Sequence, residues 1–169
     1  MKTSLLALVI LFFVVSTSAQ TTKRLGLTAG IQGNQYGIAV PIRLTQSFSL
    51  IPSVAMTYVQ ENSTDLSTGL AARFYIKQAK VSPYATLRGG VGINLPYNDA
   101  EQVMIDKSTR MDIFGGIAFG GEYFIDEHFS FGVEAQGNVT KSDDGSFRFG
   151  NPGKVNFNTA TMISATIYF

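Results

Sequence analysis

The sequence predicts an all-β protein, an eight-stranded antiparallel up-and-down transmembrane β-barrel. Three observations carry this prediction. The chain of 169 residues ends on Phe169 in a strand-like stretch, apolar residues alternate along most of its length, and it begins with an export signal. Alternation with a period of two is typical of strands, because successive side chains of a strand point to opposite faces. Helical periodicity is almost absent.

Composition narrows the class of protein. Hydrophobic residues make up 45% of the chain, which excludes a disordered protein, and charged residues make up 15%. That charged fraction is well below the roughly 25% of soluble domains. A net charge of +1 without a run of Lys or Arg gives no reason to expect a nucleic-acid partner. The absence of cysteine excludes disulfides, thiolate metal sites, thiol catalysis and a lipid anchor on cysteine.

The first residues differ in composition from the rest. Lys2 is followed by a continuous apolar run over residues 5–15 and then by small residues up to Ala19. This order is that of a secretory signal peptide, and the run is shorter than the roughly 20 residues that a membrane-spanning helix needs. We therefore predict a signal peptide over residues 1–19, cleavage between Ala19 and Gln20, and a barrel domain over residues 20–169.

Eight alternating segments follow the signal. The predicted strands cover residues 24–32, 36–45, 48–60, 68–77, 81–95, 110–124, 129–139 and 159–169. The links after the second, fourth and sixth strands are short, while the predicted loops over residues 61–67, 96–109 and 140–158 grow longer along the chain. Short turns at one rim and long loops at the other are the layout of outer-membrane barrels.

The two faces of these strands differ in their charges. On every predicted strand the apolar face lacks charged residues, and the opposite face combines small residues with charges. A charge facing lipid near the middle of a membrane costs about 2–4 kcal/mol, so a lipid face excludes charges. A soluble barrel also alternates, but its outer face would normally be rich in Lys, Glu and Thr. Small residues with opposed charges fit the crowded interior of a narrow barrel better.

Three stretches resemble the middle strands of a known family. Residues 83–92 read PYATLRGGVG, residues 115–123 read GGIAFGGEY and residues 131–136 read FGVEAQ. Their spacing of glycine and aromatic residues resembles the small outer-membrane β-barrel family, the porin-family or OmpX/OmpA-like barrels. The resemblance covers the whole mature chain and implies an eight-stranded barrel in the outer membrane of a diderm bacterium. It implies no single activity, because members of such families have different functions.

The inward charges form the main candidate site. They are predicted to pair across a narrow lumen, and they are Arg43, Arg73, Arg88, Asp112, Glu122 and Glu134. The structural interpretation is a buried salt-bridge network, because charges in a low dielectric require partners. The functional interpretation is a gate whose opening would admit ions. We favour the structural interpretation, because the interior of an eight-stranded barrel is normally filled by side chains.

The C-terminal strand carries a second candidate feature. A terminal aromatic with apolar residues at alternate positions before it resembles the assembly signal of outer-membrane barrels, here Ile163, Ala165, Ile167 and Phe169. The resemblance implies two partners, the barrel-assembly machinery and outer-membrane lipid. The long loops could contact an extracellular partner, and three aromatic residues lie in the last of them, Phe147, Phe149 and Phe157. We expect these to join an aromatic girdle or extend the strands, and less readily to form a binding surface.

No catalytic, cofactor-binding or metal site is predicted. His128 is the only histidine, and it lies beside Asp126 and Glu127 in a short turn, where a solvated side chain is the simpler expectation. The Asp143-Asp144-Gly145 stretch could hold calcium, but its spacing does not meet an EF-hand pattern. The glycine-rich stretches lack the strand-turn-helix context of phosphate-binding loops.

The sequence therefore favours a non-enzymatic outer-membrane barrel with a structural or surface-interaction role. Two alternatives stay open: a narrow channel for ions or small solutes, and a soluble periplasmic lipocalin-like binder. A channel predicts single-channel conductance that changes when Arg88 or Glu122 is neutralised. Recordings of the pure folded protein that stay flat would eliminate the channel. A soluble binder predicts extraction without detergent and an apolar cavity that quenches a hydrophobic dye.

Overall fold

The computed structural model describes residues 25–59, 63–96, 110–146 and 151–169. The predicted signal peptide with its cleavage site at Ala19 and Gln20, and the loop residues Phe147 and Phe149, lie outside the described residues. No helix among the described residues is long and apolar enough to cross a membrane.

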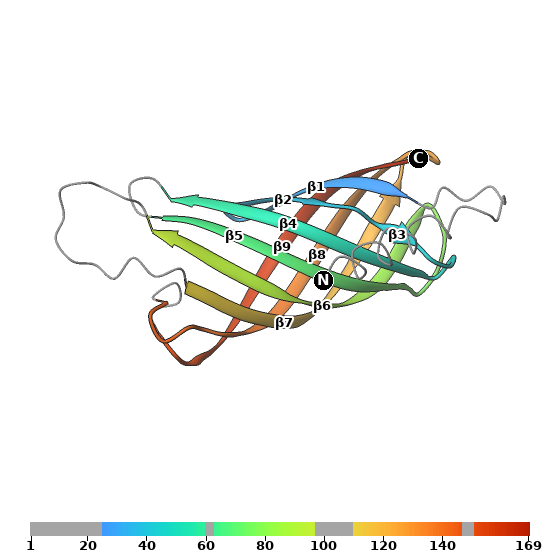
Figure 1. Cartoon of the computed structure of the whole chain (residues 1–169). Coiled ribbons are helices and arrows are strands. Elements are labelled where there is room, and N and C mark those ends of the chain that lie inside the picture. The colour runs from blue at the N-terminus through green and yellow to red at the C-terminus, as the bar shows by residue number, and fades with distance from the viewer. Residues whose placement is uncertain (1–24, 60–62, 97–109, 147–150) are drawn as a thin grey trace, which may run out of the picture.

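The described chain is a single antiparallel sheet rolled into a barrel (Figure 1). Its strands are β1 (Gly26–Gln32), β2 (Gln35–Ala39), β3 (Ile42–Arg43), β4 (Phe48–Val59), β5 (Ser63–Tyr75), β6 (Val81–Pro96), β7 (Arg110–Phe124), β8 (Phe129–Lys141) and β9 (Val155–Tyr168). Consecutive strands pair with one another except β2 and β3, which both pair with β4, and β1 also pairs with β9. The short β3 pairs with β4 and forms an isolated bridge to Leu25 through Ile42, the other strands pair along both of their edges, and the sheet closes.

The predicted number of eight strands is confirmed, because β2 and β3 are two parts of one strand. The interruption lies at Pro41, whose nitrogen carries no hydrogen to donate to a neighbouring strand. The ladder continues across the break through two backbone bonds: Val40 N donates to Pro52 O at 2.9 Å, and Gly26 N donates to Pro41 O at 2.9 Å. β3 then pairs with β4 through Ile42↔Leu50 and Arg43↔Ser49.

Two loop predictions were too long. Residues 63–67 belong to β5, and the last connection is shorter than residues 140–158, because β8 runs to Lys141 and β9 begins at Val155. The sequence is polar at the start of β5, where Ser63, Thr64 and Asp65 follow one another, and rich in Asp, Gly and Asn just before β9. Apolar alternation marks a strand only where one face is apolar, so it does not detect the polar ends.

The C-terminus lies at the rim that carries the short turns (Figure 1). Phe169 N donates to Leu25 O at 2.8 Å, and Tyr168 N donates to His128 O at 2.6 Å, so the last residues tie β9 to both neighbours. In the turn before β8, Asp126 Oδ1 accepts from His128 N at 2.7 Å and from Phe129 N at 2.8 Å. The turn carboxylate therefore caps the backbone, which accounts for Asp126 without a metal.

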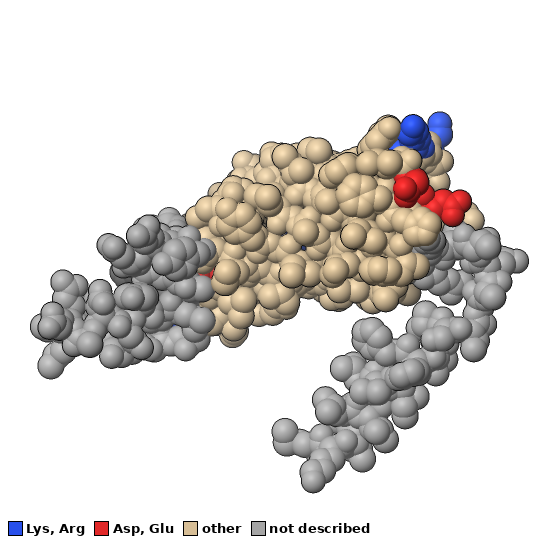
Figure 2. Space-filling view, turned by 90° about the horizontal axis from the view of Figure 1, so that it is seen from above, with Lys and Arg blue, Asp and Glu red and all other residues tan. Residues whose placement is uncertain are grey.

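The barrel is polar inside and apolar outside. Its buried side chains are mainly hydroxyls, amides and carboxylates, whereas most large apolar side chains point outward and are exposed. Exposed charges among the described residues lie near the two rims: Lys77, Lys80, Asp126, Glu127, Lys141, Asp143, Asp144 and Lys154. Figure 2 shows an almost entirely tan belt, with blue and red gathered at the end that carries the short turns. The predicted distribution of charges between the two faces is therefore confirmed over the middle of the described strands, and the exposed charge of Lys141 lies at an outward position only at the rim end of β8.

Candidate functional site

A network of charges and tyrosines occupies the half of the lumen next to the short turns. Glu122 on β7 is at its centre and is only 1% exposed. Its Oε1 accepts hydrogen bonds from Ser130 Oγ at 2.5 Å and Tyr168 Oη at 2.7 Å, and its Oε2 accepts from Tyr75 Oη at 2.6 Å. An ionised carboxylate offers about four acceptor positions, so three hydroxyls nearly saturate this one.

Arg73 joins this carboxylate to a second one. Its Nη1 lies 3.6 Å from Glu122 Oε2, and its Nη2 lies 3.3 Å from Glu134 Oε2. Glu134 also accepts hydrogen bonds from Thr86 Oγ1 at 3.4 Å and from Gln136 Nε2 at 2.9 Å. All three ionised side chains are shielded from solvent, so each requires the partners that the others provide.

Aromatic rings enclose the two arginines. The Arg73 guanidinium carbon lies 3.9 Å from the centre of the Tyr84 ring, and that of Arg43 lies 4.4 Å from the Tyr168 ring and 5.0 Å from the Phe124 ring. Rings at these distances stabilise a cation through their negative faces. Arg43 thus contributes positive charge beside Glu122 without an ion pair of its own among the described residues.

One glycine makes room for this arrangement. A Cβ placed on Gly120 would lie 2.7 Å from the ring of Tyr84 and 2.5 Å from the carbonyl oxygen of Val133. Any larger residue would therefore displace the tyrosine that covers Arg73. Gly120 is therefore explained by the close approach of the Tyr84 ring to the backbone of β7, and a phosphate-binding role is not needed to explain it.

The six predicted lumen charges do not form one network. Arg73, Glu122 and Glu134 come together, and Arg43 lies beside them. Asp112 lies elsewhere and accepts from Asp143 N at 2.9 Å and Ser146 Oγ at 3.0 Å, so it holds the last connection. Arg88 makes no ion pair with the described residues and lies 5.6 Å from the Phe114 ring.

The tyrosines and hydroxyls of the network were missed in the sequence. Tyr75, Tyr84 and Tyr168 were not predicted as site residues, although Tyr75 and Tyr84 share the parity of Arg73 and Arg88 on their strands and Tyr168 has the parity opposite to the apolar face of its strand. That parity was the available signal. A tyrosine on the charged face of a narrow barrel can bury its ring and donate its hydroxyl to a carboxylate.

The other candidates have simpler positions. Ile163, Ala165 and Ile167 point outward on β9, Phe169 follows its last residue and is exposed, and Phe157 points outward with 72% of its surface exposed. His128 Nδ1 lies 3.9 Å from Asp126 Oδ1 in an exposed turn. Asp143 Oδ1 accepts from Gly145 N at 2.9 Å and shapes its own turn. Among the described residues, no three His, Asp or Glu side chains are grouped so as to hold a metal ion.

Comparison with known proteins identifies the fold. No protein-family model matches the chain, and no curated protein matches it significantly. Two solved structures are similar over most of their length. Neisserial surface protein A matches with a TM-score of 0.57 at 13% identity, covering 86% of this chain and 93% of that one. The N-terminal β-barrel domain of Pseudomonas aeruginosa OprF matches with a TM-score of 0.53 at 14% identity, covering 86% of this chain and 95% of that one. The chain therefore has the fold of the small eight-stranded outer-membrane barrels.

Proposed function

We propose that this protein is an exported outer-membrane β-barrel with a structural or surface-interaction role and no enzymatic activity. The observation that carries the proposal is the apolar outer belt, which is free of charge between the two rims in the described strands. A water-soluble monomer rarely exposes an apolar patch larger than a few hundred Å². A bilayer covers such a belt, and closure of the sheet leaves most of the backbone bonded inside the wall.

The lumen network supports the structural role over a channel. Glu122 and Glu134 share Arg73, and the rings of Tyr75, Tyr84 and Tyr168 surround the two nearby arginines. Ions would have to separate this network to pass, which would leave buried charges without partners. The polar interior also differs from the apolar cavity that a lipocalin-like binder needs.

Export and assembly of the barrel make the proposal testable in cells. We expect the wild-type protein in the outer-membrane fraction, with Gln20 as its first residue by mass spectrometry. Phe169→Ala should reduce the assembled amount severalfold, because the assembly machinery is proposed to recognise the C-terminal strand and its terminal aromatic. Phe157→Ala is the matched control, since it also removes an exposed outward aromatic from β9, and it should assemble like the wild type.

One outcome would contradict the membrane placement, and another would contradict only the role of the C-terminal strand in assembly. The first is wild-type protein released in the soluble periplasmic fraction. The second is equal assembly of the Phe169→Ala and Phe157→Ala variants, which would remove the C-terminal strand as the assembly signal while leaving the membrane placement intact.

A further inference from the structure

The seam between β1 and β9, where the first and last strands pair and close the sheet, is short. Its pairs run only from Gly26↔Tyr168 to Ile31↔Ile163. The ladders that join each of the strands from β4 to β9 to the next cover at least twice as many residues. β9 itself extends back to Val155, with no residue of β1 beside it beyond Ile163. The seam therefore ends short of the long-loop rim.

Only strand pairing and side-chain contacts join the two sides of this seam. The short ladders of β1 with β2 and of β3 with β4 each continue into a tight turn that links their strands covalently. No such turn links β1 to β9. Because each unpaired backbone group in lipid is costly, a barrel wall opens most readily where few bonds are lost and no turn holds the strands together.

The backbone bonds of the seam come from odd-numbered residues. Phe169 N donates to Leu25 O, whereas Tyr168 N donates to His128 O on the side of β8. Successive residues of an antiparallel strand direct their backbone groups to opposite neighbours. The amides that face across the seam are therefore those of Leu27, Ala29 and Ile31 on β1 and Ile163, Ala165 and Ile167 on β9. The even-numbered residues of both strands bond to the other neighbours, as Gly26 N does to Pro41 O.

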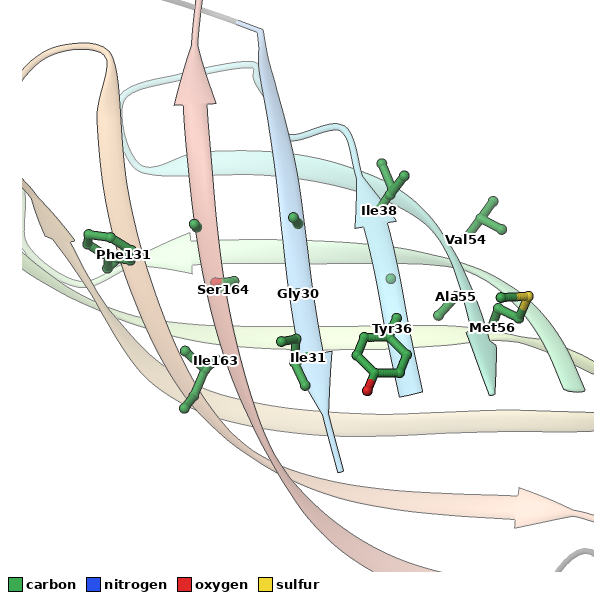
Figure 3. Close-up of a pocket in the computed structure, with 13 residues that line it drawn as sticks. Gly30, Ile31, Tyr36, Ile38, Val54, Ala55, Met56, Phe131, Ile163 and Ser164 are labelled. Carbon is green, nitrogen blue, oxygen red and sulfur yellow. The ribbon is translucent and has the colours of Figure 1, made fainter. Parts of the chain in front are cut away.

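Hollows lie on both faces of the seam. An apolar groove of about 650 Å³ on the outer face is lined by Ala29 and Ala165, which are paired in register. A cavity of about 90 Å³ on the lumen side is lined by Gly30 of β1 and Met162 of β9. Figure 3 shows Gly30 on β1 beside Ser164 on β9. Since these paired side chains are small, they add little to the backbone bonds of the seam.

Side chains hold the short-turn end of the seam together from the lumen side. A Cβ placed on Gly26 would lie 2.9 Å from Cδ1 of Tyr168, so the Tyr168 ring covers the start of β1. The guanidinium carbon of Arg43 on β3 lies 4.4 Å from the centre of the same ring. Arg43 and Tyr168 thus form a clasp that reaches over β1 and joins β3 to β9. Next to it, Thr28 Oγ1 and Thr166 Oγ1 share a hydrogen bond of 2.7 Å across the seam.

From these observations we propose that the seam between β1 and β9 is a lateral gate in the barrel wall. It opens from the Ile31↔Ile163 end while the other ladders stay paired, and the clasp of Arg43 and Tyr168 keeps it closed. Opening joins the lumen cavity to the outer groove through the wall. The inference goes beyond the role proposed above and depends on the strand pairing and on the clasp.

Residue-resolved amide hydrogen exchange of the folded mature protein in lipid nanodiscs tests the gate, with each rate corrected for its local sequence. The odd-numbered amides that face across the seam should exchange at least severalfold faster than the even-numbered amides of the same strands, for example those of Gly30 and Ser164. The even-numbered amides are a control within each strand, because they lie at similar depth but bond to β2 or β8. Equal protection of the two sets would overturn the proposal.

A substitution in the clasp tests what holds the gate closed. Arg43→Met removes the cation and should make the odd-numbered amides of the seam exchange severalfold faster still, with little change in β6, β7 and β8. Arg88→Met is the matched control, since it removes a lumen arginine that lies over Phe114 of β7, and it should leave the seam unchanged. Equal acceleration in all strands, or the same effect of both variants on the seam, would contradict the clasp.

A reversible lock tests whether opening of the seam causes the exchange. The chain contains no cysteine, so Thr28→Cys combined with Thr166→Cys introduces one opposed pair across the seam. The oxidised protein should protect the odd-numbered amides as well as the even-numbered ones, and reduction of the same sample should restore fast exchange. Exchange that oxidation does not change would contradict the gate. Only protein with the heat-dependent gel mobility of a closed barrel is used, so a negative result counts against the gate and not against the membrane placement.

Discussion

Replacing Glu122 with alanine is expected to lower the free energy of unfolding by about 3–5 kcal/mol, the range for breaking a buried ion pair. The substitution removes the acceptor of Ser130, Tyr75 and Tyr168 and leaves Arg73 with Glu134 as its remaining carboxylate. Unfolding in urea, followed in lipid vesicles, measures the change.

Two further variants define what Glu122 contributes. Glu127→Ala removes a carboxylate from the exposed turn beside β7 and should change stability by no more than about 0.5 kcal/mol. Glu122→Gln keeps an oxygen acceptor but loses the charge. Its loss of stability should therefore lie between that of Glu122→Ala and that of Glu127→Ala. If Glu122→Ala proved as stable as Glu127→Ala, the network would not stabilise the barrel and the structural interpretation would be wrong.

Arginine on the outward face should destabilise the barrel according to depth. Val133 and Val155 are both outward valines, 55% and 64% exposed, but Val133 lies inside β8 whereas Val155 begins β9 opposite Lys141. In a bilayer, Val133→Arg should lower the free energy of unfolding by about 2–4 kcal/mol, and Val155→Arg should lower it by about 0–1 kcal/mol. The same urea titration in vesicles compares the two.

The contrast between the two valines depends on the bilayer itself. In a water-soluble barrel, both outward positions would accept arginine with similar small effects, since an exposed charge remains hydrated. Equal costs at the two positions would therefore contradict the membrane placement of the belt, whatever their absolute size.

The sequence predicted which residues face the lumen but not which of them meet. Parity alone placed Arg73, Arg88 and Glu122 inside, because a strand alternates strictly. Their partners depend on register and on side-chain length across the lumen, and a shift of one residue in pairing would exchange the faces of a strand. Arg73 thus reaches two carboxylates whereas Arg88 reaches none in the described chain, a difference that composition and spacing do not encode.

Strand limits were the second feature that the sequence could not define. The middle of each strand has an apolar face, and there alternation located β6, β7 and β8 to within two residues of their observed ends. The start of β9 at Val155 follows a stretch rich in Asp, Gly and Asn, and the two alternating apolar residues Val155 and Phe157 were too few to mark a strand, so this part was predicted as loop. The short seam between β1 and β9 therefore became visible only with the strand pairing.

If the outer belt lies in a membrane and the sheet closes around the lumen, the folded barrel should be visible in its mobility on a gel. Membrane-extracted protein is run in SDS with and without boiling, since a closed membrane barrel usually resists SDS until it is heated. We expect two mobilities, one for the unheated compact barrel and one for the boiled chain. A single mobility, together with release of the protein into the soluble fraction, would contradict the closed membrane barrel.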